Sequence, residues 1–130
     1  MDEKELSKIR KVIKLALIKI GMRCDLTGFT YLCCAVELVV QSPNLIHNLC
    51  SGLYSKVGLN CNRMSGSCVE RNIRHAIEDT YIEKSFAELN RMFKAQLFTI
   101  DDKPTAGQLI KLLAEYYNLG LYKEHLGIND

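Results

Sequence analysis

The chain has 130 residues, of which 48% are hydrophobic and 25% are charged. This length suffices for one domain with a buried core, and the composition excludes an intrinsically disordered protein. The formal net charge of +2 excludes a protein that binds nucleic acid through its overall charge, so an anionic partner must meet a local patch.

The spacing of the cysteines and histidines matches neither a disulfide framework nor a metal-binding motif. No C-x-x-C pair occurs, and the three histidines lack zinc-finger spacing. We therefore expect reduced thiols, no metal and no cofactor, with a redox role of Cys68 as an alternative. No secretory signal or bilayer-spanning apolar run is present, which predicts a cytoplasmic protein without membrane contact. The six cysteines are Cys24, Cys33, Cys34, Cys50, Cys61 and Cys68.

Apolar residues at helical spacing predict two helices in the first third of the chain. The first covers residues 2–20, and Gly21 is expected to end it. The second begins at Thr27 or Gly28 and runs to about Val39. It is apolar nearly all round, so we expect it to be central and buried.

The middle of the chain is predicted to hold two helices joined by a turn. Residues 45–59, preceded by Pro43, form an amphipathic segment whose end is weakened by Gly58. The turn at residues 63–66 contains Gly66 and leads into a helix over residues 66–81. The buried face of the first of these helices is expected to consist of Ile46, Leu49, Leu53 and Val57.

The last third is predicted to contain a short helix, a link and a long helix. Phe86, Leu89 and Phe93 mark the short helix, residues 97–100 are an extended link, and Gly120 ends the long helix. About six helices and no strand result. We therefore predict an all-α, single-domain fold over residues 1–130.

The segment 66–81 has two contrasting faces. Its apolar stripe is predicted to be buried, whereas the opposite face carries long polar side chains. A helix, a glycine-bearing turn and a second helix with a basic outer face are the outline of a helix-turn-helix, whose second helix enters the major groove of DNA. A solvated charged face is the alternative. The buried stripe comprises Val69, Ile73, Ala76, Ile77 and Thr80, and the outer face comprises Glu70, Arg71, Arg74 and His75.

The residues Val69–Glu70–Arg71–x–Ile73–Arg74–His75–Ala76–Ile77–Glu78 resemble the recognition helix of the DNA-binding effector domain of the stage 0 sporulation protein A family. The resemblance spans residues 12–119, approximately. Other matching segments, in the family's order, are Gly28–Phe29–x–Tyr31–Leu32, Ala35–Val36, Leu53–Tyr54 and Lys103–Pro104–Thr105.

This resemblance implies a bacterial six-helix unit that binds short promoter boxes, often as tandem copies, and regulates transcription. By position, Glu70, Arg71 and Arg74 are expected to contact bases, and His75 to lie on the same side. Residues 84–97 match the family's surface for the RNA polymerase sigma subunit. Independently of the resemblance, Ser67, Arg63 and Lys56 are candidate backbone or supporting contacts. An apolar group near the C-terminus either closes the core or forms a homotypic contact between tandem copies; it comprises Tyr116, Tyr117, Leu119, Leu121 and Tyr122.

The chain also departs from the family's pattern. Cys68 stands where the family has a DNA-contacting arginine, and Thr80–Tyr81 stands where it has Ala-Trp. The turn at residues 62–67 is one residue longer, and residues 85–90 share little beyond hydrophobic pattern. No receiver-domain pattern with a phosphorylatable aspartate occurs in these residues, so we expect control by another route.

The sequence does not decide the roles of two residues on the outer face. Ser67-x-x-Glu70 fits a capping box, in which Glu70 folds back on the helix start, but Glu70 is free if Ser65 is the cap. Arg74 can form helical ion pairs with Glu70 and Glu78 instead of meeting DNA.

The sequence thus predicts sequence-specific binding of double-stranded DNA. The alternative is a protein-interaction module that has kept the fold but binds a regulator or a polymerase subunit. An enzyme is not expected, because no nucleophile–base pair, phosphate loop or metal cluster is recognisable.

Overall fold

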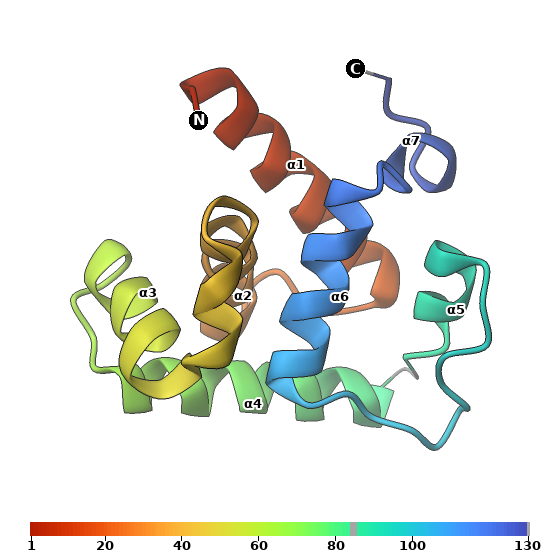
Figure 1. Ribbon diagram of the computed structural model, residues 1–130. Coiled ribbons are helices and arrows are strands. Elements are labelled where there is room, and N and C mark those ends of the chain that lie inside the picture. The colour runs from red at the N-terminus through yellow and green to blue at the C-terminus, as the bar shows by residue number, and fades with distance from the viewer. Residues whose placement is uncertain (84–85, 130) are drawn as a thin grey trace.

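The computed structural model describes residues 1–83 and 86–129, and within these ranges it is helical without a strand (Figure 1). The predicted all-α class is confirmed. The α-helices are α1 (Glu3–Ile20), α2 (Thr27–Gln41), α3 (Ser55–Asn60), α4 (Gly66–Glu83), α5 (Glu88–Phe93), α6 (Ala106–Asn118) and α7 (Tyr122–His125). A 3-10 helix, η1 (Pro43–His47), and a π-helix, η2 (Leu49–Tyr54), lie between α2 and α3.

Helix α1 has the ends that its sequence predicts. The Asp2 carboxylate accepts a hydrogen bond from the Glu5 amide at 2.8 Å, which satisfies one of the unpaired donors of the first turn. Gly21 ends the helix in the left-handed conformation, with φ of 107°, and its amide donates to the carbonyls of Leu17 and Ile18. The buried stripe consists of Ile9, Val12, Ile13, Ala16, Leu17 and Ile20.

Helix α2 is the central helix, as predicted. It packs against α1, α4 and α6, and Tyr31, Leu32 and Val36 are buried. Gly28 permits a close approach to α4, because a Cβ atom there would lie 2.1 Å from the Asn72 carbonyl oxygen. The core joins side chains from all the α-helices into one hydrophobic cluster.

The prediction of one amphipathic helix over residues 45–59 is wrong. The backbone leaves helical geometry at Asn48, with φ of −142° and ψ of 71°, which separates η1 from η2. The Leu53 amide then donates to the Asn48 carbonyl five residues earlier at 2.9 Å, which is the π-helical pattern. Leu53 and Val57 are buried as expected, whereas Ile46 and Leu49 are only half-buried.

The link before α6 is irregular and is held by a side chain. Asn90 Oδ1 accepts hydrogen bonds from the Leu97 and Phe98 amides at 2.7 and 2.9 Å, and its Nδ2 donates to the Phe98 carbonyl. Helix α6 then begins with a complete capping box between Thr105 and Gln108. Residues 97–99 thus form neither helix nor strand, and the Asn90 side chain holds them in place.

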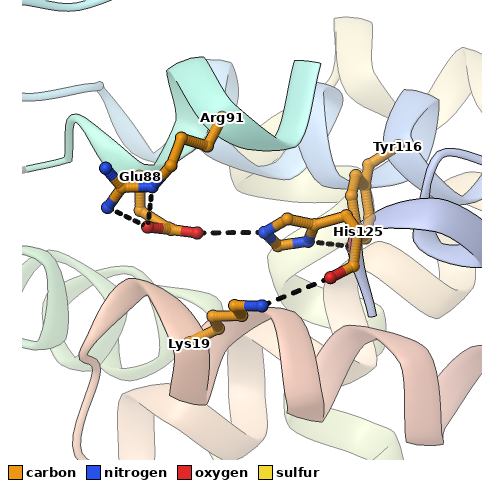
Figure 2. A network of polar contacts seen from close by, with 5 residues as sticks. All are labelled: Lys19, Glu88, Arg91, Tyr116 and His125. Atoms are coloured by element: carbon orange, nitrogen blue, oxygen red, sulfur yellow. Dashed lines mark hydrogen bonds and ion pairs between the residues drawn. The ribbon is translucent and has the colours of Figure 1, made fainter. Parts of the chain in front are cut away.

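A polar network joins α7 to three other helices (Figure 2). His125 Nδ1 lies 2.6 Å from the Tyr116 hydroxyl, and His125 Nε2 lies 2.9 Å from Glu88 Oε2. The ionised Glu88 carboxylate can only accept, so Nε2 carries the proton. Arg91 also donates to Glu88, and Lys19 Nζ of α1 donates to the His125 carbonyl at 3.2 Å. The C-terminal turn is thus fixed to the body of the domain.

Within residues 1–83 and 86–129, none of the helices combines the length and apolarity needed to cross a bilayer.

Candidate nucleic-acid interface

Helix α4 runs along one edge of the molecule, beneath the ends of α2 and α6 in Figure 1. It begins at Gly66, as predicted, and continues to Glu83, two residues beyond the predicted end. The predicted stripe is confirmed, because every member is buried: Val69, Ile73, Ala76, Ile77 and Thr80. This packing turns the opposite face of α4 toward solvent.

The first turn of α4 is capped by Ser65 and not by Ser67. Ser65 Oγ accepts from the Cys68 amide at 3.2 Å, and the Ser65 carbonyl accepts from the Val69 amide at 3.1 Å. The capping-box alternative for Ser67 and Glu70 is therefore wrong. Glu70 lies within the helix, with its carboxylate available for other contacts.

The turn before α4 is tight, but Gly66, the glycine that the sequence places in this turn, is not the cause. Gly66 is the first residue of α4, and the left-handed residue is instead Arg63, with φ of 56°. Gly58 of α3 lies directly against the turn: its carbonyl accepts from the Met64 amide at 3.1 Å. A Cβ atom on Gly58 would lie 2.0 Å from the Met64 carbonyl oxygen. Gly58 thus allows α3 and the turn to meet closely.

Arg71 occupies the middle of the outer face of α4. Its side chain is exposed, as are those of Ser67 and His75, which precede and follow it by four residues and so share its face. The described part of the chain provides no hydrogen-bond or ion-pair partner for the side chains of these three residues. The Arg71 guanidinium is therefore available to an external acceptor.

Arg74 and Glu70 are paired with each other. Arg74 Nη1 donates to Glu70 Oε1 at 2.8 Å, and the two side chains are 61% and 37% exposed. Such exposed pairs contribute only about 0.3–0.5 kcal/mol to a helix. A stronger partner can therefore separate the pair at small cost.

Lys56 and Arg63 are exposed cations outside α4. Lys56 belongs to α3 and Arg63 to the turn, so both lie on the segments that lead into α4. Neither side chain has a hydrogen-bond or ion-pair partner among residues 1–83 and 86–129.

Lys103 is a cation on this side of the molecule that the sequence analysis did not assign. Its ammonium group pairs with the Glu78 carboxylate of α4 and lies 5.4 Å from the centre of the Tyr81 ring. The Tyr81 hydroxyl donates to the Asp101 carbonyl at 2.8 Å, which holds the loop before α6 against the end of α4. Lys103, although distant from α4 in the sequence, thus extends the charged face. The helical periodicity of the sequence could not reveal this contact.

Cys68, at the position where the resemblance implies an arginine, is half-buried. The Asn72 side-chain amide donates to the Cys68 carbonyl at 2.8 Å and contacts its sulfur at 3.4 Å. The residue therefore supplies no charge to the outer face. The described residues also contain no group of three or more His, Cys, Asp or Glu side chains placed to hold a metal ion.

The arrangement is a helix whose exposed face carries an unpaired guanidinium and a separable Glu–Arg pair, with exposed cations on the segments that precede it. The family model described as "Sporulation initiation factor Spo0A C terminal" matches residues 9–117. The chain belongs to this family. The Spo0A C-terminal family is a DNA-binding effector domain, and membership connects the chain with transcription regulation and sporulation.

The segment that resembles the Spo0A surface for the sigma subunit is only partly described. Residues 84 and 85 lie outside the described residues. The remainder, residues 86–97, contains α5. Arg91 and Lys94 are exposed there and pair with Glu88 and Glu124.

Proposed function

We propose that the chain binds double-stranded DNA in a sequence-specific manner, with α4 in the major groove. In this proposal η2 and α3 form the first helix of a helix-turn-helix, and α4 is the recognition helix. The observation that carries it is Arg71: an exposed guanidinium, without a partner among the described residues, opposite the buried stripe of a helix at the molecular edge.

Two arginines and a glutamate are proposed to read bases. Arg71 would present its planar fork to O6 and N7 of a guanine. Glu70 would accept from N4 of a cytosine, which frees Arg74 from its ion pair to contact a second guanine or a phosphate. The Glu70–Arg74 pair would therefore exchange one hydrogen bond for contacts with DNA.

The remaining predicted residues are proposed to hold the helix in register. Ser67 and His75 flank Arg71 on the same face, and Lys56 and Arg63 lie on the segments before α4. Contacts of these side chains with phosphates would position α4 without selecting a sequence. Such contacts make binding strongly dependent on salt.

A protein partner is a second candidate function, supported by two features of α4. Cys68 brings no charge where the family has a DNA-contacting arginine, and Ile82 at the other end of the helix is 77% exposed. Under this proposal the fold binds a regulator or a polymerase subunit. Contact of α5 with a sigma subunit rests on the family resemblance alone.

A homotypic contact near the C-terminus is also proposed, on a smaller surface than the sequence suggests. Tyr116 and Tyr122 are buried, and Tyr117 stacks on Tyr122 with ring centres 5.5 Å apart. Leu119 alone of the predicted apolar group is strongly exposed, at 64%. We expect two copies on adjacent sites to meet through this residue.

The test of DNA reading is selection from a random duplex library at low salt. Enrichment of a short motif supports the proposal. If the chain instead selects no sequence while its circular dichroism spectrum shows that it is folded and helical, the protein-interaction function would be the better account. Capture of a regulator or of a purified sigma subunit by the folded chain would then test that function directly.

A further inference from the structure

The positive charge of the chain is concentrated in its first helix. Residues 1–20 contain six Lys or Arg and three Asp or Glu, a formal net charge of +3, whereas the whole chain has +2. The rest of the chain is therefore slightly acidic. The three acids are Asp2, Glu3 and Glu5, so every charged residue of α1 after Glu5 is a cation.

A groove lies between the N-terminal half of α1 and residues 128–129. It has a volume of about 480 Å³, and its lining combines three lysines with a serine and an asparagine. These side chains supply ammonium, hydroxyl and amide donors. Among the described residues, the lining also contains one acid, Glu5, and one apolar residue, Ile128. The donors belong to Lys4, Ser7, Lys8, Lys11 and Asn129.

The three lysines of this groove follow one another along α1. Lys4, Lys8 and Lys11 stand at i, i+4 and i+7, which places them on one face of the helix. The side chains of Lys4 and Lys11 are exposed and have no hydrogen-bond or ion-pair partner within residues 1–83 and 86–129. The Lys8 ammonium group lies 5.2 Å from the centre of the Tyr122 ring. Two ammonium groups of the row are therefore available to an external anion.

We propose that this groove is a second site for duplex DNA, which binds the phosphate backbone without reading sequence. Phosphate oxygens accept hydrogen bonds from Lys, Ser and Asn side chains, the donors that line the groove. A docked protein helix would instead require several apolar anchors, and Ile128 is the one apolar residue of the described lining. The groove therefore fits a phosphate backbone better than it fits a partner helix.

The spacing of the free lysines suits a duplex that lies along α1. Seven residues separate Lys4 from Lys11, which is about 10 Å along the helix axis. Duplex DNA carries one negative charge for about every 1.7 Å of its axis, so phosphates are within reach of both ammonium groups. Each phosphate that a lysine neutralises releases counterions, which makes the binding dependent on salt.

The groove and the outer face of α4 lie on different sides of the domain. In Figure 1, the N-terminal half of α1 is at the top of the view and α4 runs along the bottom edge. A duplex on α1 therefore does not compete for the outer face of α4. One copy can then hold two DNA segments; this consequence rests on the proposed function of α4, whereas the backbone site itself does not.

The experiment measures acetylation of each lysine in the full chain by mass spectrometry, with and without a random-sequence duplex at low salt. The duplex should slow the acetylation of Lys4 and Lys11. Lys94 and Lys111 are exposed lysines outside the groove and should react at an unchanged rate. Acetylation of Lys4 and Lys11 at the same rate with and without the duplex would overturn the proposal and leave the groove to an acidic protein. Equal protection of all four lysines would also overturn it.

The double variant Arg71→Ala/Arg74→Ala separates this site from base reading by α4. Protection of the groove lysines should persist in this variant, because neither arginine lines the groove. Protection that disappears in it would overturn a second site. A library selection that yields no motif, together with persistent protection, would reject base reading by α4 and support this site.

Paired substitutions in the same arginine-free background complete the test. Lys4→Gln/Lys11→Gln should reduce the slope of log affinity for the random duplex against log salt concentration by about 1.8, since each lost phosphate contact accounts for about 0.9. Lys94→Gln/Lys111→Gln removes the same charge and should keep the slope. Equal slopes for the two pairs would overturn the proposal, because net charge alone would then control binding.

Discussion

The Arg74 guanidinium donates to the Glu70 carboxylate across one turn of α4, at 2.8 Å, while Arg71 beside them has no partner within the described residues. The outer face of α4 therefore contains one cation ready for an acceptor and one that must first be released. This difference determines how substitutions should change DNA binding.

Replacement of Glu70 by Ala should release Arg74 and remove a negative charge from the face. We expect tighter non-specific binding with a steeper salt dependence, because one more cation can meet phosphates. Discrimination at one cytosine should fall by about 1–3 kcal/mol, since its N4 group loses an acceptor. Titration of specific and random duplexes at several salt concentrations measures both effects.

Glu83→Ala is the matched control for this substitution. Glu83 is also an exposed acid of α4, but it lies at the C-terminal end of the helix, away from Glu70. A comparable rise in random-duplex binding for both variants would show that net charge, and not release of Arg74, controls affinity.

Gly58→Ala should destabilise the domain at the turn before α4. The new methyl group would lie 2.0 Å from the Met64 carbonyl oxygen, so the turn must move. Forced overpacking of this kind costs about 1–3 kcal/mol. Urea denaturation followed by circular dichroism measures the loss. Gly107→Ala is the control, because its methyl group meets only the flexible Leu49 side chain, at 3.1 Å; equal stability of the two variants would contradict the tight turn.

The Glu88–His125 contact predicts a loss of stability in acid. Burial alone would raise the pKa of Glu88, but hydrogen bonds from His125 and Arg91 outweigh it and hold the pKa below its ordinary value. A carboxyl group with a depressed folded pKa contributes stability that is present above its unfolded pKa, about 4.3, and is lost as the pH falls through the folded pKa.

We therefore expect the urea midpoint of wild type to fall below about pH 5, with a smaller change in Glu88→Gln. Glu124→Gln is the control, because Glu124 pairs with Lys94 at the surface and its side chain is 76% exposed. Parallel pH profiles of wild type and Glu88→Gln would show that another carboxyl group causes the acid dependence.

The sequence predicts the elements that follow a simple periodicity and fails where local contacts intervene. The stripe of α4 and the central position of α2 follow from apolar spacing alone, and both are confirmed. The break at Asn48 is not visible in that spacing, because Ile46 before it and Leu49, Leu53 and Val57 after it continue one helical pattern of apolar residues.

The candidate interface shows the same division. Arg71 can be placed on the exposed face from its distance to the buried residues, and the structure does so. The choice between Ser65 and Ser67 as the cap depends on the path of the turn, which Gly58 and Arg63 determine. Lys103 joins the charged face through tertiary contacts with Glu78 and Tyr81, so its place could not be read from the local sequence.

The most direct test of DNA reading by α4 compares wild type with Arg71→Ala against a selected duplex and all its single-base variants. We predict that Arg71→Ala loses about 1–3 kcal/mol of affinity and no longer discriminates at one guanine, while preferences elsewhere persist. Lys11→Ala, which removes an exposed cation from α1, should retain every preference. If Arg71→Ala binds all duplexes more weakly by the same factor and still discriminates at every position, this result would contradict a base-reading role for this helix.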